Sequence, residues 1–489
     1  MTDPVPSPLL SEVRALAEAA RTSMPGLASE FGEVLDRIDQ PLRVAIAGKV
    51  KAGKSTLLNA LLGEELAASD AGECTRIVTW YQHGTEYAVT GETGDDRFPV
   101  AFSHTGQSLE IDLGARDADS IDRLLIEAPS TELRSMSLID TPGMASLSTD
   151  IAVKSSDFLT PEDGTDTPVD AVIYLLRHLH ATDVSFLHAF HDKEFTSPSP
   201  VNCLGVLSRA DEIAAGRLDA MDSARRIATR YSGDQRLRRL VQGVVPVAGL
   251  IGQASATITE QQVADLRTIA ALEPGPAQLA LLSVERFLTD GSFDVPTVRR
   301  QTLLDLLGVF GLRLVEHNLR TGQVADVTSV RALLRTESGI DHLADTLMVM
   351  FGGRRDTLKA RSALVTIQRL LDRDDHPREI AARLEQIWAS AHDFSELRTL
   401  NVLRDADIGL SAEDLDTAER ILGGYGTSMT DRLGLPESSS VEDRREKLFE
   451  TISQWRQRSS SPIASRPLTA LCDVVIRSCE GLVAQLDQN

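Results

Sequence analysis

An eight-residue segment, GKVKAGKS at positions 48 to 55, constrains the fold of this chain more than any other part of its sequence. It has the spacing G-x-x-x-x-G-K-[ST] of a phosphate-binding P-loop, and it stands between the apolar run LRVAIA at 42–47 and the helix-forming run STLLNALLG at 55–63. A strand, a glycine-rich turn and a helix in that order let backbone N–H groups surround a phosphate at the positive end of the helix. The sequence therefore predicts an α/β fold with a phosphate site at this turn.

The residues of this loop have different expected roles. Gly48 and Gly53 permit the sharp turn that brings the backbone close to the phosphates. Lys54 can reach the β and γ phosphates of a nucleotide, and the hydroxyl of Ser55 can bind Mg²⁺. We expect the whole segment to contact the nucleotide, and its members are Gly48, Lys49, Val50, Lys51, Ala52, Gly53, Lys54, Ser55 and Thr56.

Short apolar runs continue beyond the loop and alternate with turns and helical stretches. A mainly parallel sheet with helices on both faces has this texture, because each of its strands is buried on two sides. Between 77 and 129 the runs become shorter and alternate with polar residues, which predicts antiparallel edge strands or a hairpin. The runs expected to form the parallel strands are 42–47, 135–140, 171–176, 203–208 and 244–248.

Helical periodicity dominates both ends of the chain. Two amphipathic stretches lie within 6–39, separated by Pro25 and Gly26. After about residue 290 apolar residues recur at helix-compatible intervals, and the Gly- and Ser-rich segment 423–440 is the best candidate for a loop. We expect three parts, which are N-terminal helices at 1–40, a nucleotide-binding domain at 41–290 and a helical bundle at 291–489.

Three further residues belong with the P-loop, which by itself does not distinguish ATP from GTP. Asp140 ends an apolar run and begins the motif DTPG, where a carboxylate is placed to hold Mg²⁺ through water. The amide of Gly143, in the same motif, can sense the γ phosphate. Thr75 lies between the two motifs, where a switch loop would supply a hydroxyl to Mg²⁺ and to the attacking water, although a loop threonine without that role has the same appearance.

The segment Ser208-Arg209-Ala210-Asp211 resembles the [NT]-K-x-D motif that reads guanine, with Ser in place of Asn or Thr and Arg in place of Lys. Asp211 would accept the N1 and N2 hydrogens of guanine, which adenine cannot both donate. The stem of Arg209 can lie over the base as that of lysine does. Three residues that end the last apolar run could offer backbone amides to the base edge, although a plain turn explains them equally well, and they are Val247, Ala248 and Gly249.

The charge balance limits the partners of this chain. Acidic residues outnumber basic residues 72 to 50, which gives a net charge of −22, and such a chain is a poor candidate for binding nucleic acid. We expect no secretory signal, because no basic region followed by an apolar core opens the sequence, and no run reaches the roughly 18 apolar residues that a spanning helix needs. We therefore expect a cytoplasmic protein, with any membrane contact peripheral and at the inner face of the cell membrane.

The P-loop, Thr75, the DTPG motif and the segment 208–211 follow one another in the order found in the bacterial dynamin-like GTPases. The run GKVKAGKSTLLNALLG and the long helical C-terminal half also resemble that family. The likeness is greatest to the shorter, isoniazid-inducible mycobacterial type. The resemblance implies an α/β P-loop GTPase domain, a neck built from helices at both ends of the chain and a helical trunk. It also implies that GTP and GDP bind with Mg²⁺, and that hydrolysis is stimulated when two heads meet across the nucleotide.

Residue roles follow from the resemblance position by position. Lys54 would bind phosphate, Asp211 would read guanine, and Gly143 would belong to the second switch together with Asp140. The metal ligands would be Ser55, Thr75 and Asp140. The catalytic candidates are Lys54, Thr75 and Gly143, and Lys51 joins them on a separate charge argument rather than through the resemblance.

Two lysines of the P-loop, Lys51 and Lys49, need separate interpretation. Eukaryotic dynamins have Gln-Ser where this chain has Val50-Lys51, and that serine helps a monovalent cation to neutralise transition-state charge. Lys51 is a candidate to supply the positive charge itself, and a solvated lysine without a catalytic part is the alternative. Lys49 is similar to the lysine with which deviant P-loop ATPases reach across a dimer, although the neighbouring glycines of that signature are absent.

The resemblance favours a GTPase that dimerises through its heads and takes part in remodelling or maintenance of the cytoplasmic membrane. The turn Asp372-Arg373-Asp374-Asp375-His376-Pro377 between two long helices is acidic, which argues against lipid insertion there. A second, membrane-binding dynamin-like protein is therefore a candidate partner. The alternatives are a regulatory or assembly GTPase that acts on a macromolecular partner such as the ribosome, and a nucleotide-gated interaction protein with little turnover.

Overall fold

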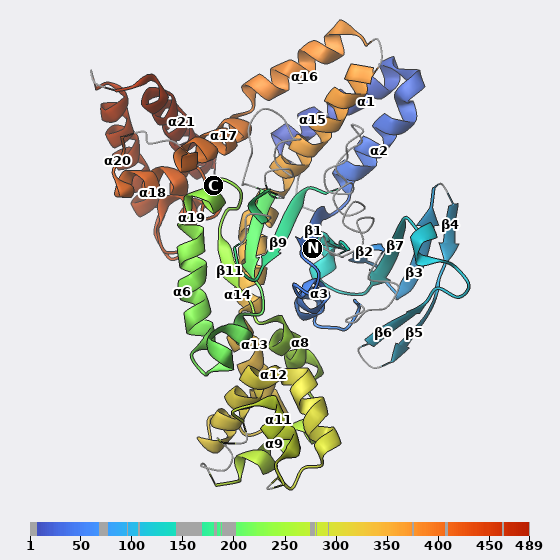
Figure 1. Cartoon of the computed structure of the whole chain (residues 1–489). Helices are drawn as coiled ribbons and strands as arrows, with labels where there is room; N and C mark the ends of the chain where they lie inside the picture. The colour runs from blue at the N-terminus through green and yellow to red at the C-terminus, as the bar shows by residue number, and fades with distance from the viewer. Residues whose placement is uncertain are drawn as a thin grey trace.

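A nine-stranded sheet lies at the centre of the computed structural model of the chain, with helices on both of its faces and helical groups at either end (Figure 1). Thr75 and Gly143, two of the predicted site residues, lie outside the described residues. The structure describes residues 7–67, 77–94, 96–105, 108–142, 169–179, 183–185, 187, 202–273, 279, 281–291, 293–373, 376–405, 409–461 and 464–488.

The described strands are β1 (Leu42–Gly48), β2 (Val78–His83), β3 (Ala88–Thr93), β4 (Asp96–Pro99), β5 (Ala101–Thr105), β6 (Ser108–Asp112), β7 (Arg123–Ala128), β8 (Met136–Asp140), β9 (Ala171–Leu176), β10 (Cys203–Leu207) and β11 (Val244–Pro246). The order across the sheet is β11-β10-β9-β1-β8-β2-β7-β3-β4. The strands from β11 to β8 are parallel, β2 is antiparallel to β8 but parallel to β7, and β3 and β4 continue antiparallel to the edge. A separate hairpin, β5 and β6, confirms the expected antiparallel segment.

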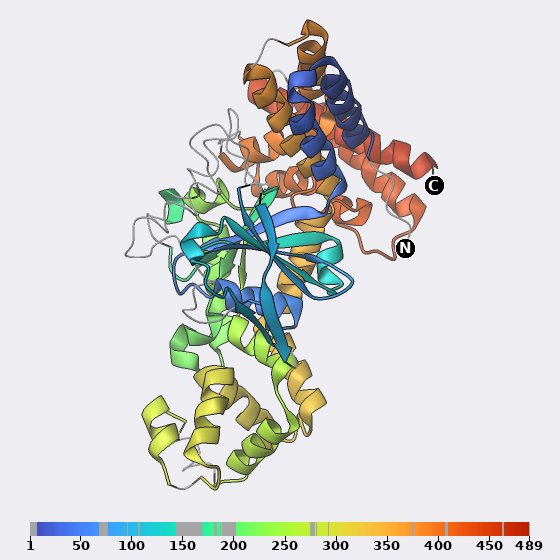
Figure 2. The same ribbon diagram turned by 90° about the vertical axis from the view of Figure 1, so that its right-hand side faces the viewer.

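Helices form most of the remaining described structure, and they surround the sheet in several groups (Figures 1 and 2). They are α1 (Pro8–Ser23), α2 (Ala28–Asp39), α3 (Lys54–Leu62), α6 (Ala220–Ser232), α7 (Gln235–Arg238), α8 (Gly249–Thr257), α9 (Glu260–Ala270), α11 (Val284–Thr289), α12 (Thr297–Arg320), α13 (Val327–Ser338), α14 (Ile340–Leu347), α15 (Arg355–Arg373), α16 (Arg378–Ser390), α17 (His392–Asp405), α18 (Ala412–Ile421), α19 (Met429–Leu433), α20 (Val441–Ser459) and α21 (Arg466–Gln488). Among these helices, none is long and apolar enough to cross a membrane.

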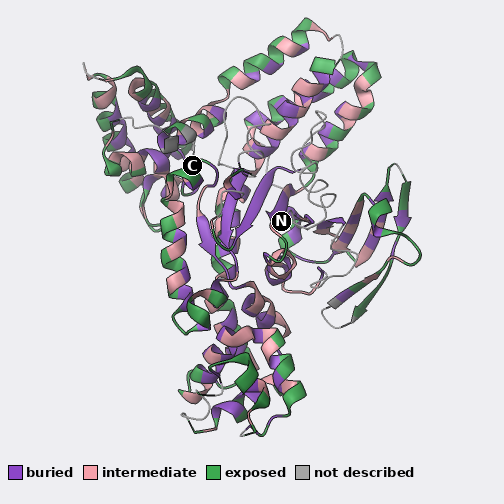
Figure 3. Ribbon diagram, viewed as in Figure 1, coloured by how far each residue is buried: buried purple, intermediate pink, exposed green. Residues whose placement is uncertain are grey.

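The middle strand β1 is buried on both faces, as are its parallel neighbours (Figure 3). Ala45 and Ala47 face a core that includes residues of α6, α8 and α12. Val44 and Ile46 face a second core, shared with α3 and α14. Both faces of the sheet are thus covered by helices, which confirms the predicted fold class.

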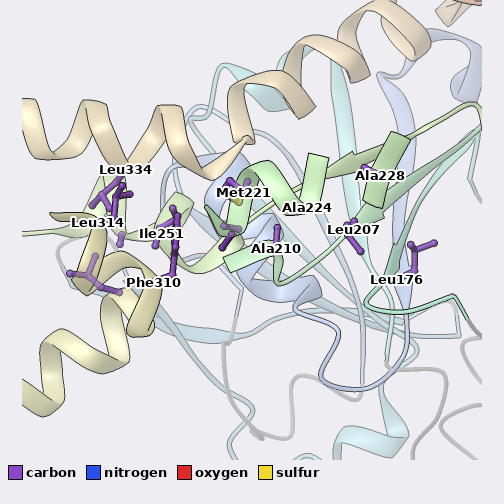
Figure 4. Packing of buried hydrophobic residues seen from close by; sticks show 14 of the residues in the cluster. Leu176, Leu207, Ala210, Met221, Ala224, Ala228, Ile251, Phe310, Leu314 and Leu334 are labelled. Carbon is purple, nitrogen blue, oxygen red and sulfur yellow. The ribbon is translucent and has the colours of Figure 1, made fainter. Parts of the chain in front are cut away.

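Helices α8, α9, α11, α12 and α13 form a lobe at the lower end of the sheet in Figure 1. Figure 4 shows that its apolar side chains continue the core of the sheet: Leu207 of β10 lies at one end, and Ile251, Phe310 and Leu334 of the lobe lie at the other. Helices α12 and α13 therefore pack with the nucleotide-binding part of the chain, although they follow residue 290.

The N-terminal helices α1 and α2 form a bundle with α15 and α16 at the opposite end of the sheet. Leu16 of α1 and Phe31 of α2 are completely buried in a core with Leu364 of α15 and Ile380 of α16. Burial of each such side chain stabilises the fold by about 1.5–3 kcal/mol. The helices predicted near the N-terminus and the helical structure predicted after about residue 290 are confirmed, and a π turn at Met348–Gly352 separates α14 from α15.

The C-terminal helices α17 to α21 have their own core, in which Trp455 and Leu448 are buried. Arg354, at the start of α15, joins this group to the rest by donating hydrogen bonds to the carbonyl oxygens of Leu422 and Gly423. The segment predicted as a loop after residue 423 contains one short helix, α19.

Candidate nucleotide-binding site

The P-loop is the turn between β1 and α3, and its shape depends on two glycines. Strand β1 ends at Gly48, where a Cβ atom would lie 2.9 Å from the carbonyl oxygen of Leu175. Gly53 has a φ of 91° and caps α3, whose first residue is Lys54. The free N–H groups at the start of this helix open onto the loop, which is an arrangement that binds phosphate.

Lys54 is folded back along the loop, and its Nζ donates a hydrogen bond to the carbonyl oxygen of Gly48 at 3.4 Å. Burial lowers the pKa of this ammonium, and the carboxylate of Asp140 partly opposes the shift. A partly desolvated cation gains more from an anionic ligand than an exposed one does. We propose that Lys54 contacts the nucleotide phosphates.

The hydroxyl of Ser55 donates a hydrogen bond to Oδ2 of Asp140 at 3.0 Å. The other carboxylate oxygen, Oδ1, is buried and has no hydrogen-bond partner among the described residues. Desolvation raises the pKa of Asp140, so its ionised form favours a cationic partner. Adjacent oxygen ligands, one of them unpartnered, fit Mg²⁺, and we propose that Ser55 and Asp140 hold this ion. Thr75, the third predicted metal ligand, lies outside the described residues.

A pocket of about 160 Å³ extends from the P-loop to the residues that follow β10 and β11. It brings residues predicted to bind phosphate together with residues predicted to read the base. The lining residues are Ala52, Gly53, Thr56, Leu57, Leu175, Val206, Ser208, Arg209, Asp211, Glu212, Val247, Gly249 and Leu250.

Asp211 is the buried carboxylate of this pocket, with 8% of the residue exposed. Desolvation raises the pKa of Asp211 above its ordinary value. Such a carboxylate is a strong acceptor for the hydrogen bonds that water no longer supplies, and guanine offers two adjacent N–H donors. Arg209 also lines the pocket, and an ion pair of 2.8 Å with Glu212 holds its guanidinium.

Two of the three amides predicted for the base edge are used within the protein. The N–H of Val247 donates to the carbonyl oxygen of Leu207, and the N–H of Ala248 donates to that of Ser338, both at 2.9 Å. This corrects the expectation that these two residues offer their amides to a base. Gly249, the third residue, lines the pocket and keeps that predicted role.

Residues 44–165 match the family model of the Dynamin family. The isoniazid-induced protein IniC of Mycobacterium tuberculosis (strain ATCC 25618 / H37Rv) is 38% identical over 453 residues, which are 92% of this chain and 91% of that protein. The chain belongs to the dynamin family. The bacterial dynamin-like protein of Nostoc punctiforme is 30% identical over 114 residues, 21% of this chain and 16% of that protein. A solved structure of an oligomerised bacterial dynamin pair covers 98% of this chain and 75% of its own, with 13% identity and a TM-score of 0.34.

The second P-loop lysine of this dynamin-family chain is held within its own subunit. Lys49 Nζ lies 3.0 Å from the carboxylate of Asp183, which is almost fully buried and also accepts a hydrogen bond from the hydroxyl of Tyr174 at 2.9 Å. An ammonium paired in this way is not extended towards a second molecule. The geometry therefore gives no support to the ATPase-type role considered for Lys49.

Several residues around the pocket were not predicted from the sequence. Glu212 directly follows the base-reading motif, and Leu250 is the second residue of α8, so both could have been found from their neighbours. Gly308 interrupts α12 with a φ of 61° and a ψ of −176°, and a Cβ atom there would lie 3.3 Å from Leu250 and 3.9 Å from Oδ2 of Asp211. A lone glycine within a helical run is a sequence signal for such a break. Asp183 gave no comparable signal.

Replacing Gly308 by alanine is expected to destabilise the protein and to weaken GTP binding. The backbone conformation at this position is essentially restricted to glycine, so the change should lower the free energy of unfolding by about 1–3 kcal/mol. The added methyl group would also crowd Leu250 beside the carboxylate of Asp211. Urea unfolding and titration with a fluorescent GTP analogue measure the two effects.

Gly322→Ala is the matched control, because Gly322 also has a positive φ, 73°, but a Cβ atom added there would meet no neighbouring atom within 4 Å. It should lower stability by about 1 kcal/mol without changing GTP affinity. Equal GTP affinity of Gly308→Ala and the wild type would contradict a role of α12 in shaping the base pocket.

Proposed function

We propose that this dynamin-family chain binds GTP with Mg²⁺ in the pocket between the P-loop and Asp211 and hydrolyses it to GDP and phosphate. The observation that carries the proposal is the composition of this single pocket. Ala52 and Gly53 of the P-loop line one part of it, and the buried carboxylate of Asp211 lies in another. One pocket thus holds both a phosphate-binding turn and an acceptor for two N–H donors, which are the two features that the two ends of a guanine nucleotide need.

In this proposal different residues bind the phosphates, the base and the Mg²⁺ ion. The N-terminus of α3 and Lys54 bind the β and γ phosphates, and Asp211 orients the base. Mg²⁺, when held by Ser55 and Asp140, supplies positive charge beside the bridging and γ oxygens. Thr75 and Gly143 are proposed to position the attacking water and to sense the γ phosphate.

We propose that Lys51 adds positive charge during hydrolysis. It is exposed on the P-loop in a left-handed conformation, φ 61°, and no hydrogen bond or ion pair joins it to another described residue. Lys51→Ala should therefore lower kcat by about 100-fold, the effect of losing one preorganised charge, with a much smaller change in KM. Phosphate release at saturating GTP measures kcat.

The neighbouring Val50 is 41% exposed, and Val50→Ala provides a control that alters the same loop without removing charge. It should keep a kcat close to that of the wild type. Unchanged turnover in Lys51→Ala, together with a requirement for potassium in the wild type, would contradict this role and leave Lys51 a solvated side chain.

We also propose that the heads pair across bound nucleotide and that the protein takes part in remodelling or maintenance of the cytoplasmic membrane, peripherally and from its inner face. Membership of the dynamin family supports this role. Arg373 and His376, two described residues at the α15–α16 turn, have polar side chains and offer no apolar side chain to a bilayer. A second dynamin-like protein that binds lipid is therefore the proposed partner if the chain does not bind membranes by itself.

Sedimentation with vesicles tests the membrane part of the proposal. The full-length protein is spun with vesicles of phosphatidylglycerol or phosphatidylcholine, without nucleotide, with GDP and with a non-hydrolysable GTP analogue. Pelleting with anionic vesicles that depends on the GTP analogue supports direct membrane action. If the protein hydrolyses GTP but stays in the supernatant under all three nucleotide conditions, it needs a membrane-binding partner or acts on another target, for example a macromolecular assembly.

A further inference from the structure

A second pocket, of about 540 Å³, lies between the sheet and the helical bundle. It shares no lining residue with the nucleotide pocket, and its volume is typical of small-molecule sites, roughly 300–1,000 Å³. Strands β1, β4 and β7 contribute one wall, α2 a second and α15 a third. Six of its lining residues are arginines, namely Arg37, Arg43, Arg97, Arg123, Arg369 and Arg373.

The register of the sheet places three of these arginines on one face. Side chains two residues apart on a strand point to the same side. Four residues pair in register across neighbouring strands and therefore lie on one face of the sheet: Ala45 of β1, Ile139 of β8, Trp80 of β2 and Leu125 of β7. Arg43 is two residues before Ala45, and Arg123 is two residues before Leu125, so both arginines lie on that face. Arg97 pairs in register with Glu92, which pairs with Arg123, so Arg97 is on this face as well.

The pocket carries an excess of positive charge. Its six arginines face only three acidic lining residues, Glu30, Glu33 and Asp36, all on α2. The lining residues alone thus carry an excess of three positive charges, whereas the whole chain has a net charge of −22. A local field of this sign favours anionic ligands that the rest of the surface repels.

Among the arginines that the sheet contributes to this pocket, Arg43 is the one whose charge is least balanced by carboxylates. Arg37 pairs with Asp170 at 3.0 Å, and Arg97 and Arg123 both pair with Glu92. Arg43 has no carboxylate within ion-pair distance among the described residues. It donates a hydrogen bond of 2.6 Å to the side-chain oxygen of Gln40, and its guanidinium lies 5.0 Å from the centre of the Trp80 ring.

The environment of Arg43 disfavours its charge. Burial lowers the pKa of Arg43 to about 10, repulsion from Arg37 and Arg123 adds to the shift, and Asp170 opposes it. The guanidinium is still protonated at neutral pH, so the folded protein keeps a desolvated cation among other cations. An anion in the adjacent pocket would relieve this cost.

We propose that this pocket binds a ligand that carries phosphate groups, with Arg43 as a central contact. A planar guanidinium can bond two oxygens of one phosphate, which makes arginine the side chain best suited to this task. The ligand would touch the sheet, α2 and α15 at the same time, so its binding would couple the nucleotide-binding head to the helical bundle. The headgroup of an anionic phospholipid and a soluble phosphorylated molecule present the same chemistry.

Two probes distinguish a soluble phosphorylated ligand from a lipid headgroup. Both are applied to the full chain in saturating GDP and Mg²⁺, so that the P-loop is occupied and does not bind the probe. Calorimetry with inorganic pyrophosphate reports a soluble ligand, and sedimentation with phosphatidylglycerol vesicles, compared with phosphatidylcholine, reports a lipid headgroup. Arg43→Gln should weaken binding of the effective probe by about 10- to 100-fold, as expected for one charge-assisted contact. Removal of this poorly compensated cation should not lower the melting temperature of the protein.

Arg236→Gln is the charge-matched control, since Arg236 is exposed on α7 and pairs with Asp234 outside the pocket. It should leave probe binding unchanged. Arg369→Gln, on the α15 wall, is a second pocket variant that keeps the test valid if Arg43→Gln does not fold. Weakened pyrophosphate binding in the pocket variants supports a soluble ligand, and weakened vesicle binding alone supports a lipid headgroup. No binding of either probe, or binding equally strong in wild type and pocket variants, would overturn the proposal.

Discussion

Replacing Lys54 by alanine is expected to abolish GTP turnover, with kcat/KM falling by at least about 1,000-fold, because charge stabilisation of the transferred phosphoryl group is the main source of catalysis in this class of reaction. Lys54 is the ammonium that lies along the P-loop beside Gly48, whereas Lys49 is held by Asp183. The measurement is phosphate release from GTP under single-turnover and steady-state conditions.

The same variant should remain folded, since Asp140 keeps its hydrogen bond from Ser55. A thermal unfolding curve close to that of the wild type checks this point. Lys447→Ala removes an exposed lysine of α20 that pairs with Glu450, and it should have no effect on turnover. Near-normal hydrolysis by Lys54→Ala would show that the P-loop does not carry the chemistry.

Replacing Asp211 by asparagine is expected to weaken GTP binding by at least about 100-fold, because a site built to accept two N–H donors strongly rejects a mismatched pattern. An amide presents one acceptor and one donor, and xanthine offers a carbonyl oxygen where guanine has its amino group. The variant should therefore prefer XTP to GTP. Competition of GTP, XTP and ATP against a fluorescent nucleotide measures this change.

Asp222→Asn makes the same substitution on the exposed side of α6, where Asp222 pairs with Arg225, and it should leave base selection unchanged. The stability of Asp211→Asn should not fall, because the buried carboxylate of Asp211 is replaced by a neutral side chain of the same shape. If the wild type binds ATP as tightly as GTP, the assignment of Asp211 to guanine is wrong.

The local part of the site was predictable because its signals are short-range. The P-loop combines a strand, two glycines and a helix start within about 20 residues, and the backbone at Gly48 and Gly53 follows from that order. The burial of β1 on both faces also followed from its continuous apolar run. Asp140 was found because it ends an apolar run and begins DTPG, and Asp211 because the segment 208–211 after another apolar run resembles the guanine motif. Parallel strands bring the ends of such runs to one edge of the sheet.

Other features depend on partners that are distant in sequence. The ion pair of Lys49 with Asp183 joins residues 134 positions apart, and no pattern around Asp183 announces it. The hydrogen bond from the N–H of Ala248 to the carbonyl oxygen of Ser338 links the pocket to the end of α13, and it removes an amide that appears available in the sequence. Apolar periodicity shows that a helix buries one face, but it does not show which other element that face packs against. The packing of α12 and α13 on the core of the sheet could therefore not be predicted.

We propose that this chain is a GTPase whose heads act in pairs, and the rate of GTP hydrolysis per molecule as a function of protein concentration tests this proposal most directly. With Mg²⁺ present, we expect the rate per molecule to rise with protein concentration for GTP and to stay negligible for ATP. A rate per molecule that does not change with concentration would contradict head pairing. Equal turnover of ATP and GTP would contradict the guanine pocket.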